Sequence, residues 1–378
     1  MPNLFIPKEA PPGETRVAAT PETVKLYIKT GLTVSIEAGA GKKSFITDDQ
    51  LTAAGATIVS RADGFANADL VASVAPPLAS DIAAMKPGAI LIALLAPHRH
   101  VDLVRVLAQS KVTSFAMELI PRTTRAQVMD ALSSQASIAG YKAALIAATE
   151  LPRYFPLLMT AAGTIKPARV VVMGAGVAGL QALATAKRLG AVVEVSDIRP
   201  AVKEQVASLG GRFIDLPMAE SGEGTGGYAK EVSADFLRKQ RDVLAHHISL
   251  ADVVITTAQV PGRKAPVLVT KEMLDGMKPG SVVIDLAVEA GGNVEGSQEG
   301  EVNHKGVRIL GYANLACTLP YDASTLYARN VQALSGEFVK KDGTISLDLA
   351  NEIISGSLLT HDGNVMHAPT AELLKGGA

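Results

Sequence analysis

Short apolar runs alternate with amphipathic stretches through the first third of the chain. Apolar runs bounded by turn residues indicate strands, and stretches with an apolar stripe at helical spacing indicate helices. A first helix is predicted to begin at Pro21, with Thr20 as its N-cap. The predicted strands are 4–6, 32–36, 57–59, 70–74, 89–95 and 112–116, and the remaining predicted helices are 48–54, 60–67, 79–85 and 100–110. This alternation predicts a parallel, doubly wound sheet.

The alternation resumes after a long helix in the middle of the chain. A polar loop feeds this helix, which is expected to continue to about Glu150, and its small residues Ala136, Ser137, Ala139 and Gly140 would let it pass tightly between two domains. Beyond it we predict strands at 170–173, 192–195, 213–214, 253–257 and 281–287, helices at 177–189, 234–245 and 322–334, a hairpin-like element at 302–311, and short β pieces with a polar tail over 344–378. The sequence therefore predicts an α/β protein of two Rossmann-like domains joined by long helices. The first domain is discontinuous, 1–135 plus 314–378, and the second is 136–313.

A glycine-rich motif directly follows the strand 170–173 and opens the next helix. In this GxGxxG pattern Gly174 makes the tight turn, Gly176 lets the backbone approach a pyrophosphate, and Gly179 allows close packing of helix and strand. A glycine-rich turn alone can serve packing only, but here strand, motif, helix, second strand and a terminal acid occur in register. The sequence therefore predicts a dinucleotide site. Its predicted residues are Gly174, Ala175, Gly176, Val177, Ala178, Gly179, Asp197, Ile198 and Arg199.

The acid that ends the second strand, Asp197, is expected to select the cofactor. Its carboxylate would accept hydrogen bonds from the adenosine ribose hydroxyls and repel a 2′-phosphate. NAD(H) is therefore favoured over NADP(H). Arg199 alone could accept a phosphate, but after an acid we expect it to face the pyrophosphate or solvent.

Composition narrows the possible partners and setting. The 378 residues carry a net charge of −1, which argues against a nucleic-acid partner because such a partner requires a basic face. The single cysteine, Cys317, cannot form an intramolecular disulfide, and no Cys/His cluster has metal-ligand spacing. No membrane segment or signal peptide is recognisable. We expect a cytoplasmic protein that reaches a membrane only through a partner.

Several long segments resemble the superfamily of alanine dehydrogenases and proton-translocating transhydrogenases. The matching segments are IPKE (6–9), ETRVAATP (14–21), SFITDDQLTAAGA (44–56), MTAAGTIKPARVVVMGAGVAGLQA (159–182), KEQVASLGG (203–211) and MKPGSVVIDLAVEAGGN (277–293). In alanine dehydrogenases a catalytic lysine matches Ala75 and a catalytic histidine matches Ala96. Arg16 and Glu289 remain at substrate-site positions, but without acid–base groups they could not complete an oxidative deamination. His98 and His100, which lie nearby in sequence, could substitute in principle.

The loop PRTTRAQVMDALSSQ resembles the signature of the NAD(H)-binding component of transhydrogenases. The resemblance implies that Arg122, Gln127 and Asp130 surround the nicotinamide as catalytic residues. The alternative for Asp130 is a charge that caps a helix. Residues 226–231 resemble a mobile loop that closes over nucleotide, although the glycine-rich stretch 220–227 could be a plain surface connection. Further cofactor contacts implied by the resemblance are Thr123, Thr124, Arg125, Ser133, Gly227, Tyr228, Gln240 and Gln259.

The resemblance also implies an activity and its partners. A Re/Si-specific transhydrogenase passes hydride directly between NADH on this chain and NADP⁺ on a partner subunit, coupled to proton movement across the membrane. Membrane-embedded subunits, an NADP(H)-binding subunit and a homodimer are implied, and a metal is not. Two other interpretations stay open: a soluble amino-acid dehydrogenase of the alanine or saccharopine type, and a nucleotide-binding module without catalysis, such as a redox sensor.

Overall fold

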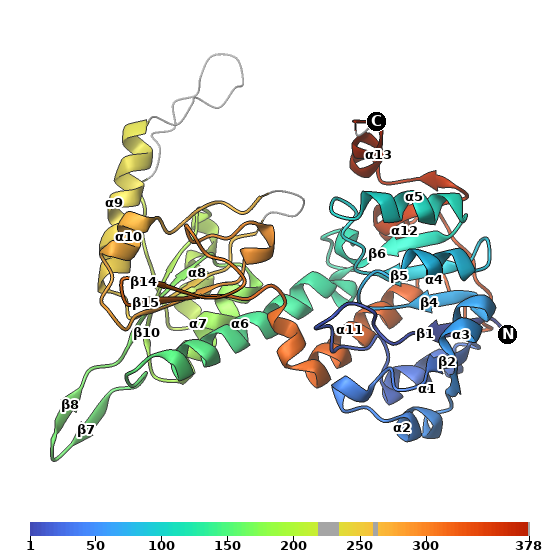
Figure 1. Ribbon diagram of the computed structural model, residues 1–378, viewed down its shortest axis with the longest axis horizontal. Helices are drawn as coiled ribbons and strands as arrows, with labels where there is room; N and C mark the ends of the chain where they lie inside the picture. The colour runs from blue at the N-terminus through green and yellow to red at the C-terminus, as the bar shows by residue number, and fades with distance from the viewer. Residues whose placement is uncertain (218–233, 260–263, 377–378) are drawn as a thin grey trace. The chain divides into compact units, whose positions relative to one another are not determined.

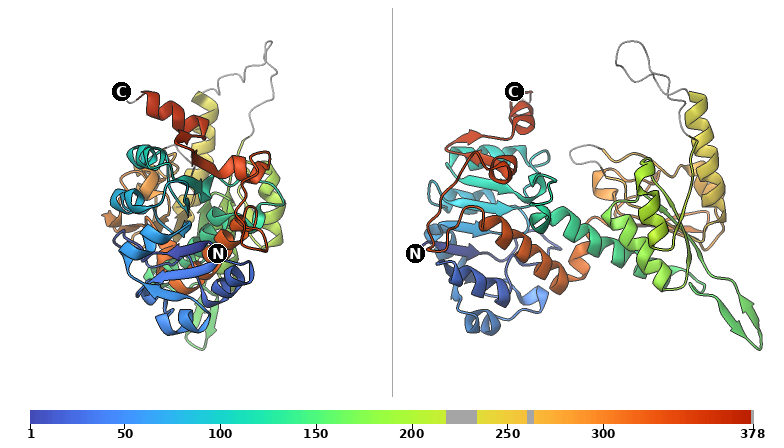
Figure 2. Two further views of the ribbon diagram at one scale, coloured as in Figure 1. Left: turned by 90° about the vertical axis from the view of Figure 1, so that its right-hand side faces the viewer. Right: turned by 180° about the vertical axis from the view of Figure 1, so that it is seen from behind.

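The computed structural model describes residues 1–217, 234–259 and 264–376 and divides into two compact units (Figure 1). Unit 1 comprises residues 1–135 and 316–378, and unit 2 comprises residues 136–315. The chain enters unit 2 within helix α6, Ala131–Glu150, and returns within the short 3-10 helix η6, Leu315–Thr318. Unit 1 therefore contains both ends of the chain (Figure 2).

The described part of unit 1 is built on an eight-stranded sheet in the order β17-β16-β6-β5-β4-β1-β2-β3. Strands β1 to β6 pair in parallel, whereas β16 lies antiparallel to β6 and β17 antiparallel to β16. The strands are β1 Asn3–Ile6, β2 Thr33–Glu37, β3 Thr57–Val59, β4 Leu70–Ala72, β5 Ile90–Ala93, β6 Thr113–Ala116, β16 Leu358–His361 and β17 Asn364–Val365. The helices are α1 Pro21–Lys29, α2 Asp48–Ala53, α3 Arg61–Asn67, α4 Ala79–Ala84, α5 Val101–Gln109, α11 Pro320–Ser335, α12 Glu352–Ser357 and α13 Ala368–Gly376, with 3-10 turns η1 Lys42–Ser44, η2 Met117–Leu119 and η3 Gln127–Met129.

Both faces of this sheet are buried. Leu4 and Ile6 of β1 pack into a core that includes Tyr327 of α11, whereas Phe5 packs into the core on the opposite face with Phe65 of α3. Alternate side chains of one strand thus reach different layers, as in a doubly wound sheet.

Unit 2 repeats the plan, with seven described strands in the order β11-β10-β9-β12-β13-β15-β14. All pair in parallel except the edge strand β14, which is antiparallel to β15. The strands are β9 Arg169–Met173, β10 Val192–Ser196, β11 Arg212–Phe213, β12 Val253–Thr256, β13 Val282–Asp285, β14 Gly300–His304 and β15 Val307–Gly311. The helices after α6 are α7 Val177–Arg188, α8 Lys203–Ser208, α9 Ala234–Leu250 and α10 Lys271–Asp275, with 3-10 turns η4 Pro200–Val202 and η5 Val288–Ala290. The strand order reverses direction between β9 and β12, and ligands of such sheets bind at the carboxyl ends of the strands beside this reversal.

The predicted fold class is confirmed, and the differences are local. Helix α9 runs to Leu250 rather than to 245, and residues 344–378 include helices α12 and α13 besides the predicted short strands. A separate hairpin, β7 Leu158–Thr160 and β8 Gly163–Ile165, projects from unit 2 (Figures 1 and 2). The hairpin escaped prediction because each strand has three residues and almost no buried face, so no alternating pattern marks it.

Candidate functional site

Two glycines of the fingerprint are required by the backbone itself. Gly174 has φ +107°, and a Cβ there would lie 2.7 Å from Thr257 Oγ1. A Cβ on Gly179 would lie 1.8 Å from the carbonyl oxygen of Gly174, so strand end and helix touch directly at this position. Both observations agree with the turn and packing roles expected from the sequence.

The third glycine, Gly176, is different because it faces open space. No described atom lies within 4 Å of the position that a Cβ would occupy, and the backbone is extended at φ −77°. Gly176 is the N-cap of α7, so the first N–H groups of that helix point outward beside it. A phosphate could approach this backbone closely, and the helix N-terminus would favour its charge. The fingerprint therefore fits a dinucleotide pyrophosphate.

Asp197, at the end of β10, is held against the fingerprint. Its Oδ2 accepts the Ala175 N–H at 2.7 Å, and Arg199 donates to Oδ1 through Nε at 2.9 Å and to Oδ2 through Nη2 at 2.9 Å. Burial raises the pKa of Asp197, but the hydrogen bonds from Arg199 and Ala175 outweigh this effect and keep the pKa below its usual range. The carboxylate is thus ionised and 7 % exposed.

The expectation that Arg199 faces the pyrophosphate or solvent is corrected by this pairing. The guanidinium is 58 % exposed, yet its fork lies on Asp197 because a bidentate contact with a carboxylate two residues away is available. The positive charge therefore partly neutralises the group expected to reject a 2′-phosphate.

This pairing makes a prediction about nucleotide choice. Asp197→Asn should raise the ratio of NADPH affinity to NADH affinity by roughly tenfold, or 1.4 kcal/mol, because the repelling charge is lost and Arg199 is released. Arg199→Ala is the matched variant and should lower the same ratio. Fluorescence titration of each variant with both reduced nucleotides measures the effect, and a ratio that moves the same way in both variants would contradict this role of the pair.

The other nucleotide contacts expected in unit 2 have varied surroundings. Ile198 is 88 % exposed and Val177 is 44 % exposed, so both present apolar surface beside the fingerprint. Gln240 Nε2 donates to the Pro217 carbonyl at 3.1 Å, and the exposed Gln259 donates to the Leu286 carbonyl at 2.5 Å. Gly227, Tyr228 and the loop 220–231 lie outside the described residues.

Asn293 and Asp285, which sequence reasoning did not single out, fix the backbone on either side of Gln259. Asn293 accepts the Ala258 N–H at 3.0 Å and donates to the carbonyls of Ala258 and Pro266 at 2.9 and 2.8 Å. Asp285, at the end of β13, in turn accepts the Asn293 N–H at 2.9 Å. Both side chains are fully buried. The signal available in sequence was the polar pair itself, one residue at a strand end and the other in a glycine-rich turn.

In unit 1, the segment 121–133 presents polar side chains on an anchored backbone. Ala126 and Met129 are buried in the core, whereas Arg122, Thr124 and Gln127 are exposed. Thr123 Oγ1 is buried and has no hydrogen-bond partner among the described residues. The segment thus offers the amide and guanidinium groups that the sequence predicts for a nicotinamide site, and it is called the nicotinamide segment below.

Asp130 and Arg125 both have protein partners. Asp130 caps helix α6, since Oδ1 accepts the Ser133 N–H at 2.9 Å and Oδ2 accepts the Ser133 hydroxyl at 2.6 Å. Arg125 pairs with Glu337, to which Asn351 also donates at 2.8 Å. The capping alternative for Asp130 is therefore confirmed, and each carboxylate oxygen keeps a further lone pair for a ligand.

The positions that carry acid–base groups in alanine dehydrogenases are filled by backbone and carboxylates. Glu9 accepts the N–H groups of Val74 and Ala75 at 2.7 and 3.0 Å, and Glu118 accepts those of Leu95 and Ala96. Both sites lie beyond the carboxyl ends of β4 and β5. An alanine methyl group exchanges no proton, so neither position supplies an acid or base. His98 and His100, the possible substitutes, are both exposed.

Arg16 is occupied by an internal partner. Its Nε and Nη2 donate to Glu14 at 2.8 and 2.7 Å, and its Nη1 donates to Gln135 at 2.9 Å. Burial opposes ionisation of both partners, but their mutual hydrogen bonds outweigh it, so the pKa of Glu14 is lowered and that of Arg16 is raised. The guanidinium is 6 % exposed and neutralised, so it is poorly placed to bind a substrate carboxylate.

The chain matches both domains of one protein family. Residues 5–139 match the alanine dehydrogenase/PNT N-terminal domain, and residues 143–368 match the alanine dehydrogenase/PNT C-terminal domain. The chain belongs to the alanine dehydrogenase/PNT family. This confirms the superfamily predicted from the sequence.

Within the alanine dehydrogenase/PNT family, the chain is more similar to transhydrogenase subunits than to a dehydrogenase of comparable coverage. An NAD(P) transhydrogenase subunit alpha protein of Rhodospirillum rubrum is 49 % identical over 374 residues, covering 96 % of this chain and 97 % of that protein. The crystal structure of transhydrogenase from Sinorhizobium meliloti superposes with a TM-score of 0.87 at 47 % identity, covering 96 % and 99 % of the two chains. The alanine dehydrogenase of Mycobacterium tuberculosis is 32 % identical over 370 residues, covering 96 % and 94 %. The chain is therefore a homologue of transhydrogenase alpha subunits.

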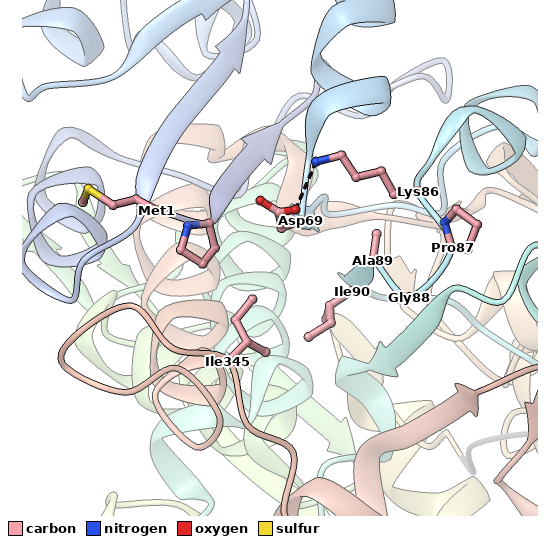
Figure 3. Close-up of a pocket in the computed structure, with 9 residues that line it drawn as sticks. Met1, Asp69, Lys86, Pro87, Gly88, Ala89, Ile90 and Ile345 are labelled. Atoms are coloured by element: carbon pink, nitrogen blue, oxygen red, sulfur yellow. Dashed lines mark hydrogen bonds and ion pairs between the residues drawn. The ribbon is translucent and has the colours of Figure 1, made fainter.

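Other features of the described ranges bear on further ligands. In these ranges, no helix is long and apolar enough to cross a bilayer, and no group of three His, Cys, Asp or Glu side chains could hold a metal. An open groove of about 570 Å³ lies in unit 1, where Lys86 reaches Asp69 at 3.0 Å (Figure 3). It adjoins the amino ends of β1, β4 and β5, the edge opposite to the one at which doubly wound sheets bind ligands.

Proposed function

We propose that the chain is the NAD(H)-binding component of a proton-translocating NAD(P)⁺ transhydrogenase. The observation that carries the proposal is the pairing of a nucleotide fingerprint with a dismantled acid–base site. Gly176 leaves room for a pyrophosphate, whereas Ala75, Ala96 and the internally paired Arg16 supply no proton chemistry. Hydride transfer between two nicotinamide rings requires no acid or base at the reacting carbon, so this combination suits transhydrogenation.

The proposed roles of the residues follow from their chemistry. Bound NADH supplies the hydride, and the protein must hold and orient it so that donor and acceptor carbons come within about 3–3.5 Å. Asp130 stabilises the positive charge that develops on the oxidised ring. Arg122 orients the carboxamide or the adjacent ribose, and Gln127 reaches towards the second nucleotide. Asp197 selects NAD(H) through the ribose hydroxyls, and Tyr228 and Gly227 contact the nucleotide from the loop 226–231.

The proposed partners follow from what one chain must share with others. The chain carries one GxGxxG fingerprint, so NADP(H) binds on a partner subunit. Proton movement belongs to membrane-embedded subunits, on which this chain docks peripherally from the cytoplasm. By the same family resemblance, the chain forms a homodimer. Re/Si specificity is included in the same proposal.

The role of Gln127 can be separated from nucleotide binding. Gln127→Asn shortens the side chain by one methylene and should lower the hydride-transfer rate by about tenfold, because transfer depends steeply on the positions of the reacting groups. The dissociation constant for NADH should stay within about twofold, since the fingerprint supplies the main contacts. Stopped-flow transfer and NADH titration measure the two quantities. Equal losses in both would count against a role in reaching the second nucleotide.

One comparison of activities tests the proposed function. The chain alone is supplied with alanine and NAD⁺, and separately the chain with its NADP(H)-binding partner is supplied with NADH and NADP⁺. The proposal expects NADH formation in neither case and NADPH formation only in the second. Reduction of NAD⁺ by alanine on the isolated chain would identify a dehydrogenase instead.

A further inference from the structure

A chain of buried polar side chains in unit 1 ends on the backbone of the nicotinamide segment. Asn330, on α11, is 7 % exposed and lies about two hundred residues from that segment in sequence. Its Nδ2 donates to the Val128 carbonyl at 2.8 Å, between Gln127 and Asp130. Its Oδ1 accepts the Ser134 hydroxyl at 2.7 Å. One amide thus joins η3 to the first turn of α6.

The same chain of contacts continues to the buried ion pair. Gln135 Nε2 donates to Ser134 Oγ at 3.3 Å and to the Ala323 carbonyl at 3.1 Å, and Gln135 Oε1 accepts from Arg16 Nη1 at 2.9 Å. Gln135 is 9 % exposed. The Glu14–Arg16 pair therefore anchors a continuous path through Gln135 and Ser134 to Asn330.

The nicotinamide segment needs such an external anchor. Its own turn bonds include two long ones, from Gln127 N to Thr124 O at 3.4 Å and from Asp130 N to Gln127 O at 3.3 Å. The side chain of Val128 is 63 % exposed and gives the turn no apolar anchor. A single 3-10 turn with poor hydrogen-bond geometry holds its shape weakly. Asn330 supplies the fixed point on the backbone between the two functional side chains.

We infer that Asn330 is a positioning residue for hydride transfer, acting through the Val128 carbonyl, and that Ser134, Gln135 and the Arg16–Glu14 pair hold Asn330 in place. The inference rests on the proposed function. In this account Arg16 has a structural use that requires no substrate carboxylate. Buried networks of this kind fix geometry when every member is satisfied. The network touches neither fingerprint nor Asp197, so NADH affinity depends little on it.

The test compares Asn330→Ala with Ser335→Ala, a buried polar residue on the same helix whose hydroxyl donates to Gln332 at 2.7 Å within that helix. Asn330→Ala should lower single-turnover hydride transfer to partner-bound NADP⁺ about tenfold, because small displacements of reacting groups have large effects on rate. NADH affinity should stay within about twofold of wild type. Amide hydrogen exchange in residues 121–130 of the nucleotide-free chain should be faster than in wild type. Ser335→Ala should match wild type in rate and in loop exchange.

A second variant covers the case in which Asn330→Ala does not fold. Ser134→Ala removes one hydroxyl from a half-buried position and should show a smaller change of the same kind, with non-additive effects in the double variant. A wild-type rate and wild-type loop exchange in either folded variant would overturn the inference, as would an equal slowing in Ser335→Ala. Loss of NADH affinity in step with rate would also overturn it. If wild-type chain and partner exchange no hydride at all, it is the proposed function that fails.

Discussion

Replacing Gly176 with valine is expected to abolish useful NADH binding without unfolding the chain. The backbone of Gly176 is extended, a conformation that valine adopts readily, and no described atom lies within 4 Å of the new Cβ. The side chain would instead occupy the space through which a pyrophosphate reaches the N–H groups of α7. Losing about 3 kcal/mol of charge-assisted hydrogen bonds weakens affinity about 100-fold. Titration of NADH fluorescence measures this loss.

Gly179→Ala is the matched variant for this experiment because it lies in the same motif and should fail for the opposite reason. Its Cβ would lie 1.8 Å from the Gly174 carbonyl oxygen, so strand and helix must separate. Overpacking of this kind costs about 3 kcal/mol. We expect a clear fall in melting temperature for Gly179→Ala and little change for Gly176→Val. Wild-type NADH affinity in Gly176→Val would show that no phosphate approaches this backbone.

The second large effect is expected at Asp130, where charge and helix capping can be separated. Asp130→Asn keeps an oxygen that can cap α6 but removes the negative charge. Asparagine is as good an N-cap as aspartate, so stability should change by less than about 1 kcal/mol. The hydride-transfer rate should fall about 100-fold, which is typical when one preorganised electrostatic group is removed from a reacting centre.

Asp130→Ala completes the comparison. It removes both charge and cap, and loss of a cap costs about 1 kcal/mol. We expect the same rate as in Asp130→Asn, with a lower melting temperature. Thermal melts and single-turnover transfer measure the two properties independently. If Asp130→Asn transfers hydride at the wild-type rate, the residue is a helix cap only.

The architecture and the fingerprint could be predicted because their determinants are local. The strand 170–173, the glycines and Asp197 lie within thirty residues, and each has a fixed role in a short structural unit. Strand–helix alternation likewise predicted two doubly wound sheets. The C-terminal helices were missed although Asn351 caps α12 by accepting the Ile353 N–H at 3.0 Å. A six-residue helix gives too short a pattern for its periodicity to be recognised.

The supporting contacts of the candidate site could not be predicted because they join distant segments of the chain. Asn330 reaches Val128 and Glu337 reaches Arg125 across about two hundred residues. Nothing in the local sequence of α11 distinguishes a buried asparagine that holds a loop from one that faces solvent. The pairing of Arg199 with Asp197 is local, but sequence alone left open which group the guanidinium would contact.

Direct transfer of hydride is the central claim, and an isotope label tests it. NADH carrying deuterium on the transferring face of the nicotinamide is bound to the chain, the NADP⁺-loaded partner subunit is added in ordinary water, and the product is analysed by mass spectrometry. The account predicts NADPH that retains the deuterium, because no side chain exchanges a proton during the transfer. Label lost to water, or product formed only when an amino or keto acid is present, would contradict it.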